Sequence, residues 1–391
     1  MQKGNNIIKS IQNFIRIPSY SGQEKEAAHF LKKLMQNLGY DDVYIDNWGN
    51  VIGIIEGKST QTILLEGHLD TVEVDNEDDW KHAPFKAETV NNRIYGRGAS
   101  DMKGALITMV YAGAAFANDK DLNKNIVVAG TVQEEIFEGV AQANIINEIN
   151  PNLVIIGEAS DLKLCIGQRG RAEIKVTTFG KNAHSSNPKK GINAVKKMNK
   201  FLTEIEKTPT KRDNDLGEGI LEVVDIKSKP YPGHSVIPHQ CSITLDRRLL
   251  PNETEKSVLK PLNNLIDKLK KEDTDFKAKV EIPKESAVTY TNKKFKADKF
   301  FPGWKFSVDN EFVKNTYDKL KNEIPETDLS YYSFCTNGSY SAGEQNIPTL
   351  GFGPSCEHLA HIADEYIEIN QIEKAYQGYI SIIETFLENN F

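Results

Sequence analysis

Histidine and acidic side chains follow apolar segments at several widely separated places in this sequence. They are His68, Asp70, Asp101, Glu134, Glu135, Glu158 and His361. Imidazole and carboxylate groups are the ligands of zinc-like divalent cations, and a carboxylate can also act as a general base. Such a set would perform metal-assisted acid–base chemistry if the fold brought its members together.

Each position alone also has an ordinary structural interpretation. A histidine two residues before an aspartate, as in His68 and Asp70, is usually incidental. Asp101 lies in a glycine-flanked run before a predicted helix and is also typical of a helix N-cap. The adjacent pair Glu134 and Glu135 suits a solvated loop, although a turn at a strand end could direct both into one site.

The elements that must position these residues alternate between strand and helix. We predict strands over 43–46, 51–56, 62–67, 125–133 and 153–157, and helices over 5–15, 101–118 and 140–147. A further helix is predicted from a capping box, Ser21 to Glu24, to Leu38, with Gly39 as its stop. This alternation indicates an α/β layer with a largely parallel sheet, whose strand ends would gather the histidines and acids at one edge.

The gathered set matches what two divalent cations bridged by one carboxylate require. It offers two histidines, one aspartate and two glutamates, with one glutamate and one aspartate in reserve. Nitrogen and oxygen ligands without cysteine favour Zn, Co or Mn. We therefore expect two divalent metal ions per chain, zinc first among them.

The pattern changes near residue 170. Strands over 172–179, 218–227, 241–249 and 277–282 and helices over 191–207 and 254–272 give the order β-α-β-β-α-β, which predicts a ferredoxin-like α+β domain. This domain, 171–283, would be inserted into a catalytic, metal-binding domain made of 1–170 and 284–391. We expect it to act as a lid, and its exposed edge strand to pair with a second chain in a homodimer.

Residues 213–219 and 293–303 are predicted to be exposed loops. The α/β pattern resumes after the inserted domain, with a helix over 310–322, a strand over 349–352 and a helix over 371–389.

Composition excludes several functional classes. The 391 residues carry a net charge of −7, so the chain is a poor nucleic-acid binder. The longest apolar run, 105–117, is too short to span a bilayer, and the N-terminus has no signal-peptide core. Four scattered cysteines favour a reducing compartment. We expect a cytoplasmic protein without nucleic-acid or membrane partners.

Five motifs in order resemble the co-catalytic zinc aminoacylases and exopeptidases. They are GHLDTV, GRGASDMKG, QEE, GEA and a late AHIADE, and they span nearly the whole chain. The resembled family includes acetylornithine deacetylase, succinyl-diaminopimelate desuccinylase, glutamate carboxypeptidase and aminoacylase. The segments SVIPHQCSITLDRRLLPNET and TNGSYSAGEQNIPTLGFGPS look most like its selenium-metabolism-associated hydrolase branch.

This resemblance implies roles for individual residues. His68 and Glu158 would bind one metal, Glu135 and His361 the other, and Asp101 would bridge both. Glu134 would be the general base toward the attacking water. Asp70 would orient His68, by accepting its second N–H.

The resemblance also implies substrate contacts. His184 would stabilise the oxyanion, often across a dimer interface, and Arg247 would hold a substrate carboxylate in a bidentate contact. Arg248, its neighbour, competes for that role. Asn337 and Gly338 fall in a loop that contacts substrate in the family.

Together these expectations describe a hydrolase that cleaves the amide bond of an N-acyl amino acid. A dipeptidase or carboxypeptidase of the same family is the alternative, with a dipeptide as substrate. A metal-binding protein without catalysis is a remoter alternative, which the spare Glu134 argues against. A serine or cysteine hydrolase is disfavoured because the chain has no GxSxG elbow.

Overall fold

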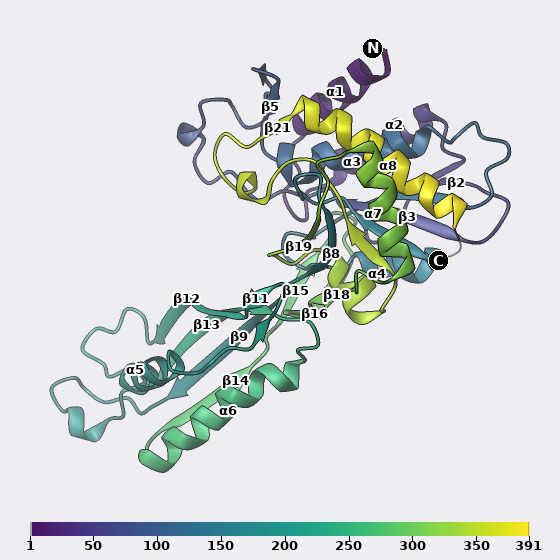
Figure 1. Cartoon of the computed structure of the whole chain (residues 1–391). Coiled ribbons are helices and arrows are strands. Elements are labelled where there is room, and N and C mark those ends of the chain that lie inside the picture. The colour runs from purple at the N-terminus through teal and green to yellow at the C-terminus, as the bar shows by residue number, and fades with distance from the viewer. Residues whose placement is uncertain (1, 390) are drawn as a thin grey trace. The chain divides into compact units, whose positions relative to one another are not determined.

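The computed structural model describes residues 2–389 and 391, and the chain forms two compact units (Figure 1). Unit 1 comprises Met1–Gln168, Ser286–Phe295 and Trp304–Phe391, and unit 2 comprises Arg169–Glu285 and Lys296–Gly303. Residues 296–303, expected in the larger domain from the sequence, belong to unit 2. They do so because β17 (Phe300–Phe301) pairs with β9 (Gly170–Phe179).

A mixed nine-stranded sheet forms the centre of unit 1, in the order β1-β2-β6-β3-β7-β20-β8-β18, with β19 beside β8. Its members are β1 (Asp42–Ile45), β2 (Val51–Ile55), β3 (Thr62–His68), β6 (Asn125–Thr131), β7 (Leu153–Ile156), β8 (Leu164–Gln168), β18 (Trp304–Lys305), β19 (Leu329–Tyr332) and β20 (Thr349–Gly351). The four central strands, β6, β3, β7 and β20, pair in parallel. The predicted α/β class is confirmed.

Helices cover both faces of this sheet, which explains why its strands are apolar without alternation. Along β3, Ile63 and Leu65 join the core under the helices of one face, whereas Leu64 faces the other side with α4 (Gln142–Ile149). The first face carries α1 (Gln2–Ile15), α2 (Lys25–Leu38), α3 (Gly104–Ala114), α7 (Glu311–Glu323) and α8 (Ile369–Glu388).

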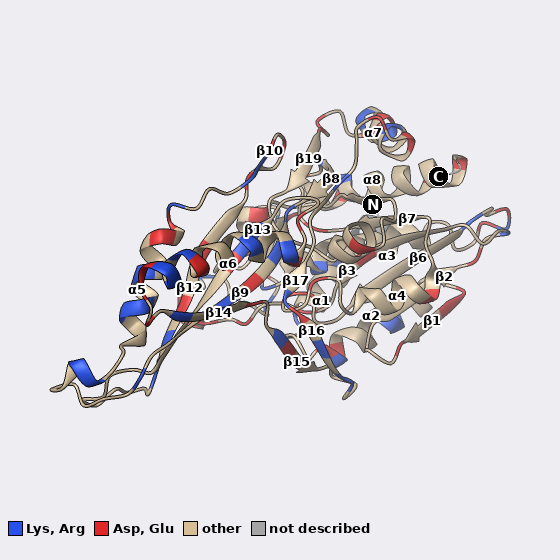
Figure 2. Cartoon of the chain, turned by 90° about the horizontal axis from the view of Figure 1, so that it is seen from below, with Lys and Arg blue, Asp and Glu red and all other residues tan. Residues whose placement is uncertain are grey.

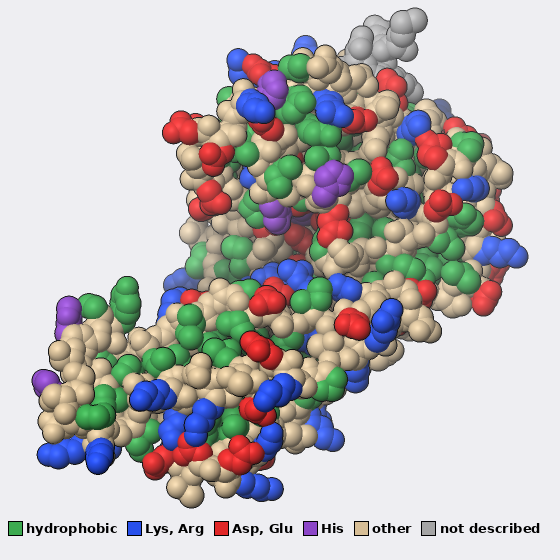
Figure 3. All heavy atoms as spheres, turned by 60° about the vertical axis from the view of Figure 1, so that its left-hand side comes forward, with side chains coloured by type: hydrophobic (Ala, Val, Ile, Leu, Met, Phe, Trp, Pro, Cys, Tyr) green, Lys and Arg blue, Asp and Glu red, His purple; other side chains and the backbone are tan. Residues whose placement is uncertain are grey.

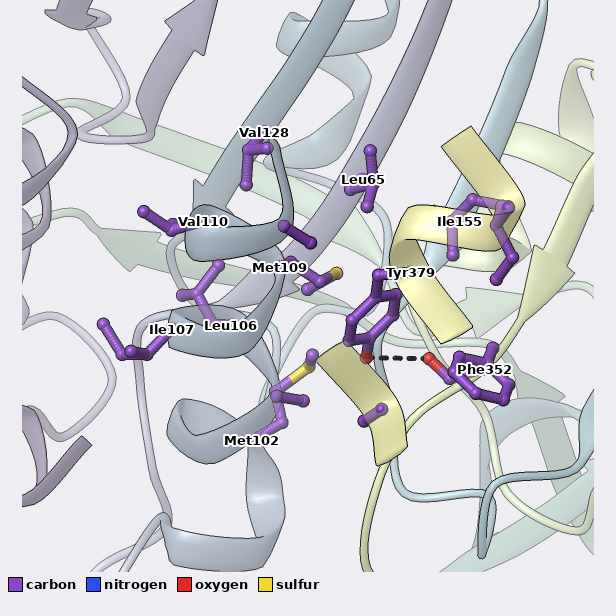
Figure 4. Packing of buried hydrophobic residues seen from close by; sticks show 14 of the residues in the cluster. Leu65, Met102, Leu106, Ile107, Met109, Val110, Val128, Ile155, Phe352 and Tyr379 are labelled. Atoms are coloured by element: carbon purple, nitrogen blue, oxygen red, sulfur yellow. Dashed lines mark hydrogen bonds between the residues drawn. The ribbon is translucent and has the colours of Figure 1, made fainter. Parts of the chain in front are cut away.

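Figure 4 shows this core, with α3 and α8 side chains packed over the strands. The buried Tyr379 hydroxyl donates to the Phe352 carbonyl at 2.9 Å, so the deepest polar atom of α8 is satisfied.

Two predicted helix starts are wrong. Ser21 does not cap α2, which begins at Lys25 after Glu24, and no side chain caps it. Gly39 does end α2 in the left-handed conformation, as predicted. Asp101 is not an N-cap either, because Asp101 and Met102 have non-helical backbone angles and α3 starts later, at Gly104.

Unit 2 is an antiparallel sheet, β12-β13-β9-β14, covered by two helices. Its other elements are α5 (Ala194–Ile205), β12 (Ile220–Lys229), β13 (Gln240–Leu249), α6 (Glu255–Glu272) and β14 (Lys277–Glu281). The predicted β-α-β-β-α-β order is confirmed, while the lid and dimerisation roles stay predictions. Thr254 and Ser257 form a capping box at the start of α6.

The remaining strands of the described chain are short, and some of them lie in two segments that the sequence predicts as loops. They are β4 (Thr89–Val90), β5 (Arg93–Tyr95), β10 (Arg212–Asp213), β11 (Gly217–Glu218), β15 (Lys284–Val288), β16 (Lys294–Asp298) and β21 (Tyr366–Glu368). The segments 213–219 and 293–303 therefore contain strand residues rather than only loops, since β10 pairs with β11, β16 with β15 and β17 with β9. Within the described part of the chain, no helix combines the length and hydropathy needed to cross a membrane.

Candidate metal centre

The parallel pairing of three neighbouring strands brings the first ligand candidates to one edge of the unit 1 sheet. β3 ends at His68, Glu134 and Glu135 follow β6 by three and four residues, and Glu158 follows β7 by two. Because β3 lies between β6 and β7, these side chains converge. In Figure 3, acidic and histidine side chains lie together on one face of this unit.

Asp101 lies between the two histidines. Its Oδ1 is 2.9 Å from Nε2 of His68, and its Oδ2 is 3.0 Å from Nε2 of His361. Glu158 Oε1 lies 3.4 Å from the same His68 nitrogen, and Glu135 Oε2 lies 3.1 Å from that of His361. One carboxylate thus joins two groups, each made of one histidine and one glutamate.

The tautomer of His68 follows from its second nitrogen. Nδ1 lies 2.8 Å from the backbone oxygen of Asp70, and a carbonyl can only accept, so Nδ1 carries the hydrogen in the neutral ring. The lone pair of Nε2 then faces the oxygens of Asp101 and Glu158. Electron pairs that face one another in this way need a proton or a cation between them.

The electrostatics of the buried acids fit bound cations. Burial and the charge of Asp101 raise the pKa of both Glu135 and Glu158 to about 7. Bonds to Asp101 and Glu135 raise the pKa of His361 to about 10, and burial opposes them. Oε1 of Glu135 is buried and has no hydrogen-bond partner among the described residues. Bound cations would relieve the repulsion between these acids, and one of them would give Oε1 of Glu135 a partner. The nitrogen and oxygen donors suit zinc-like ions.

Glu134 is the second buried acid of this turn. It is 6% exposed, its Oε2 is 3.9 Å from Nε2 of His68, and it forms a potential ligand group with His68 and Glu158. Burial raises its pKa well above the ordinary value, and the neighbouring glutamates add to this effect. The placement suits a general base beside the cations, and that role stays a prediction.

The resemblance implies that the Asp70 carboxylate accepts the second N–H of His68. The structure shows a different contact. The carboxylate Oδ1 is 3.8 Å from Nδ1, and the backbone oxygen takes the contact instead. The carboxylate accepts the backbone N–H groups of Glu134 at 3.1 Å and Glu135 at 3.2 Å. Asp70 therefore supports the turn that carries the two glutamates.

Glu365, which has no assigned role in the sequence analysis, supports the segment that carries Asp101. Its buried carboxylate accepts the amides of Gly98, Ser100 and Asp101 at 2.8–3.1 Å and pairs with Arg97 at 2.8 Å. It holds the backbone that carries the bridging Asp101. The sequence signal for Glu365 is its place beside Asp364 at the end of the AHIADE motif.

The side-chain amide of Asn337 is hydrogen-bonded inside unit 1. Its amide donates to Glu66 at 2.7 Å and Thr131 at 2.9 Å, and its oxygen accepts from the Gly139 amide at 2.6 Å. Both N–H groups of the side chain are bonded within unit 1, and the residue is only 4% exposed, so it offers little to a substrate. Gly338 is also enclosed, since a Cβ there would lie 2.7 Å from the Trp304 indole nitrogen. The structure therefore favours a structural role for both.

Basic side chains recur along the strands and α5 of unit 2 (Figure 2). Among them are Arg247, which the resemblance favours as the contact to a substrate carboxylate, and its competitor Arg248. Arg247 is 6% exposed, and its Nη2 lies 2.8 Å from both carboxylate oxygens of Glu253. It faces the core side of β13, whereas Arg248 alternates to the open face, where its side chain is 32% exposed. Arg248 is also paired, with Asp246 at 2.8 Å, but both of these side chains are partly exposed, so Arg248 is the more accessible of the two arginines to a substrate carboxylate.

His184 is exposed in unit 2, and its ring has a defined tautomer. The Ser186 amide donates to Nδ1 at 3.2 Å, so Nε2 carries the hydrogen in the neutral ring. That N–H points to no hydrogen-bond acceptor in the described part of the chain, and it can serve as a donor to an oxyanion.

An α/β unit with an inserted antiparallel sheet, and a histidine–carboxylate centre at its strand ends, defines a metal-dependent hydrolase. The sequence matches peptidase family M20/M25/M40 over residues 64–385, and the chain belongs to this family. The family resemblance drawn from the five motifs is confirmed.

Known proteins of similar sequence and structure agree with this assignment. The uncharacterized protein YgeY of Escherichia coli (strain K12) is 34% identical over 366 residues, 91% of this chain and 88% of its own length. An acetylornithine deacetylase of Aliivibrio fischeri (strain MJ11) is 28% identical over 331 residues, 81% of this chain and 79% of its own. The M20 family metallo-carboxypeptidase Sso-CP2 of Sulfolobus solfataricus shares the fold, with a TM-score of 0.77 and 20% identity over 98% of this chain and 99% of its own.

Proposed function

We propose that this protein hydrolyses the amide bond of an N-acyl amino acid, releasing a carboxylic acid and the free amino acid. The observation that carries the proposal is the placement of Asp101, whose two oxygens lie 2.9 Å and 3.0 Å from the two histidines. That arrangement supports a pair of cations with one shared ligand.

His68 and Glu158 would hold one divalent cation and His361 and Glu135 the other. Zinc is the expected metal, and cobalt or manganese also suits these donors. When bound, two such ions lower the pKa of the attacking water and polarise the scissile carbonyl.

The chain's own residues would complete the reaction. Glu134 takes a proton from the attacking water and passes it to the leaving nitrogen. His184 donates its Nε2–H to the oxygen of the carbonyl as charge develops there. Arg248 binds the free carboxylate of the substrate, which confines cleavage to amides beside a carboxylate.

The edge of the unit 2 sheet supports a second element of the proposal, a homodimer. β12 ends the strand order and exposes apolar side chains, namely Ile220, Val223, Val224 and Ile226. Unpaired backbone groups on such an edge favour pairing with a second chain. Light scattering after gel filtration tests this element directly.

The activity is tested by measuring primary-amine release from a panel of N-acyl amino acids and dipeptides, with zinc, cobalt or manganese added. We expect release from acyl amino acids, loss of release with a chelator, and recovery when metal returns. Asp101→Asn, which keeps the side-chain shape, should abolish release, whereas the exposed Glu26→Gln should leave it unchanged. Release confined to dipeptides would make the protein a peptidase instead, and release that a chelator leaves intact would refute a metal mechanism.

A further inference from the structure

Three consecutive amides in the turn that carries Glu134 and Glu135 are held by two buried carboxylates. The Gln133 N–H donates to Oε1 of Glu24 at 3.2 Å, and the next two N–H groups donate to the two oxygens of Asp70. Gln133 has a positive φ of 62°, a conformation that a residue with a side chain adopts at a cost. External hydrogen bonds are therefore needed to keep the turn in this shape.

Both carboxylates depend on one short segment that precedes α2. Ser21 donates its hydroxyl to Oδ2 of Asp70 at 2.6 Å, and the Gly22 amide donates to Oε1 of Glu24 at 2.8 Å. Glu24 and Asp70 are both 0% exposed. The segment thus contacts the two supports of a turn that lies about a hundred residues later in the chain.

Water cannot replace these contacts easily, because the groups are buried. A buried amide that loses its acceptor retains the cost of desolvation. The turn would have to move to recover a partner. Glu134 and Glu135 would move with it, and a displacement of about 1 Å is enough to lower the rate of an enzyme strongly.

We propose that Ser21 and Glu24 are positioning residues, which fix the Gln133–Glu135 turn so that Glu134 and Glu135 are presented to the cations and the attacking water. This inference rests on the proposed function for its catalytic part. The predicted capping box is thus replaced by a role at the metal centre.

The chemistry of Glu24 suggests a conservative variant for the test. Burial, with the nearby charge of Asp70, raises the pKa of Glu24 to about 8, so the carboxyl group is mostly neutral at pH 7. Glutamine has the same shape and the same acceptor oxygen. Glu24→Gln should therefore retain the positioning contact, and Glu24→Ala should lose it.

The first measurement needs neither metal nor substrate. Amide hydrogen exchange of the metal-free protein should show at least tenfold faster exchange at Gln133–Glu135 in Glu24→Ala. The exchange rates of these amides should equal the wild-type rates in Glu24→Gln and in the control Glu26→Ala, which changes an exposed residue of the same helix. Equal exchange in Glu24→Ala and Glu26→Ala would overturn the proposal.

The second measurement uses Co²⁺ as a probe of the ligand that the turn carries. Glu24→Ala should bind one equivalent of Co²⁺ at least tenfold more weakly and shift its visible absorption, with the thermal midpoint near that of Glu26→Ala. With metal saturating, kcat should fall about tenfold while KM changes less than twofold, and Glu24→Gln should restore both values. A lower thermal midpoint that accounts for every change, or a Glu24→Gln variant as impaired as Glu24→Ala, would contradict the inference. If the wild type cleaves no panel substrate, the proposed function fails, while exchange and Co²⁺ binding still decide the positioning role.

Discussion

Buried charge is arranged differently in the two units. In unit 2, Arg247 and Glu253 form a complete pair, in which both carboxylate oxygens lie 2.8 Å from one guanidinium nitrogen. In unit 1, the carboxylates of Asp101, Glu134, Glu135 and Glu158 converge on two histidines without a permanently charged partner of their own.

The difference separates structural from functional charge. A buried acid is expensive unless a cation or several donors balance it, and unit 2 supplies that balance from its own chain. Unit 1 balances Glu365 in the same way, with Arg97, but leaves the balance of the acids around the two histidines to be supplied from outside, as a bound divalent cation would supply it. Incomplete internal pairing therefore indicates the reactive centre better than the number of charged residues does.

The largest expected effect comes from removing the acid that the cations do not require. Glu134→Gln should lower kcat by about 10²–10⁴-fold, the usual contribution of a general base, while two equivalents of metal remain bound. Steady-state kinetics and metal analysis of the same sample check both parts. Full turnover would show that Glu134 is not the base, and loss of metal would make it a ligand.

The next effect tests the complete pair of unit 2. Arg247→Met should lower the free energy of unfolding by about 3–5 kcal/mol, because Glu253 would remain buried without its cation. Urea unfolding followed by circular dichroism measures this loss. KM should stay close to the wild-type value, and a stability equal to that of Arg248→Met would contradict the structural assignment.

The neighbouring arginine should respond in the opposite way. Arg248→Met should raise KM about 10–100-fold, the equivalent of one lost charge-assisted contact to a substrate carboxylate, with little change in unfolding. Kinetics with an N-acyl amino acid and with the amide of its carboxylate provide the check. The ratio of kcat/KM for the acid to kcat/KM for the amide should be smaller in the variant than in the wild type. An unchanged ratio would show that Arg248 does not bind the substrate carboxylate.

The smallest effect concerns a partly exposed charge cluster in unit 2. Bonds to Lys197 and Lys200 lower the pKa of Asp273 from 3.8 to about 2. A lowered carboxyl pKa adds stability above pH 3.8, which is lost as the pH falls through 2. Asp273→Asn should therefore cost about 1 kcal/mol at pH 7, and the difference from wild type should vanish near pH 2 in urea unfolding. Asp267→Asn, which removes an exposed carboxylate on the same helix, is the matched control.

The sequence predicted the elements of the fold because their patterns are local. The apolar strands of unit 1 and the β-α-β-β-α-β order of unit 2 were visible from periodicity and length. Convergence of the ligand candidates then followed from the parallel order of β3, β6 and β7. Strand ends in such sheets form binding sites, which accounts for His68, Glu134, Glu135 and Glu158. Asp101 and His361 do not follow these strands, and the family resemblance was needed to include them.

The burial of Arg247 could also have been predicted from the sequence. Arg247 is in phase with Ile243, Leu245 and Leu249 along β13, and these apolar residues face the core. The period of two places Arg248 on the opposite face. The family resemblance favours Arg247, whereas the alternation along the strand favours burial of that side chain.

Other contacts were beyond local patterns. Ser21 and Glu24 have the spacing of a capping box, but their partners, Asp70 and Gln133, lie far along the chain. Asn337 likewise binds Glu66 and Gly139, which only the folded sheet brings near. Long-range hydrogen bonds of this kind leave no periodic trace in a sequence.

The shared carboxylate of Asp101 has a thermodynamic consequence for the proposed centre. Two binding equilibria that use one ligand are coupled, because the first ion changes the charge and geometry that the second ion meets. Linkage requires the coupling to be reciprocal, so each ion alters the affinity for the other by the same factor. Occupancy of one position would then depend on whether the other is filled, so an ion that occupies one position would change the apparent affinity measured for the other.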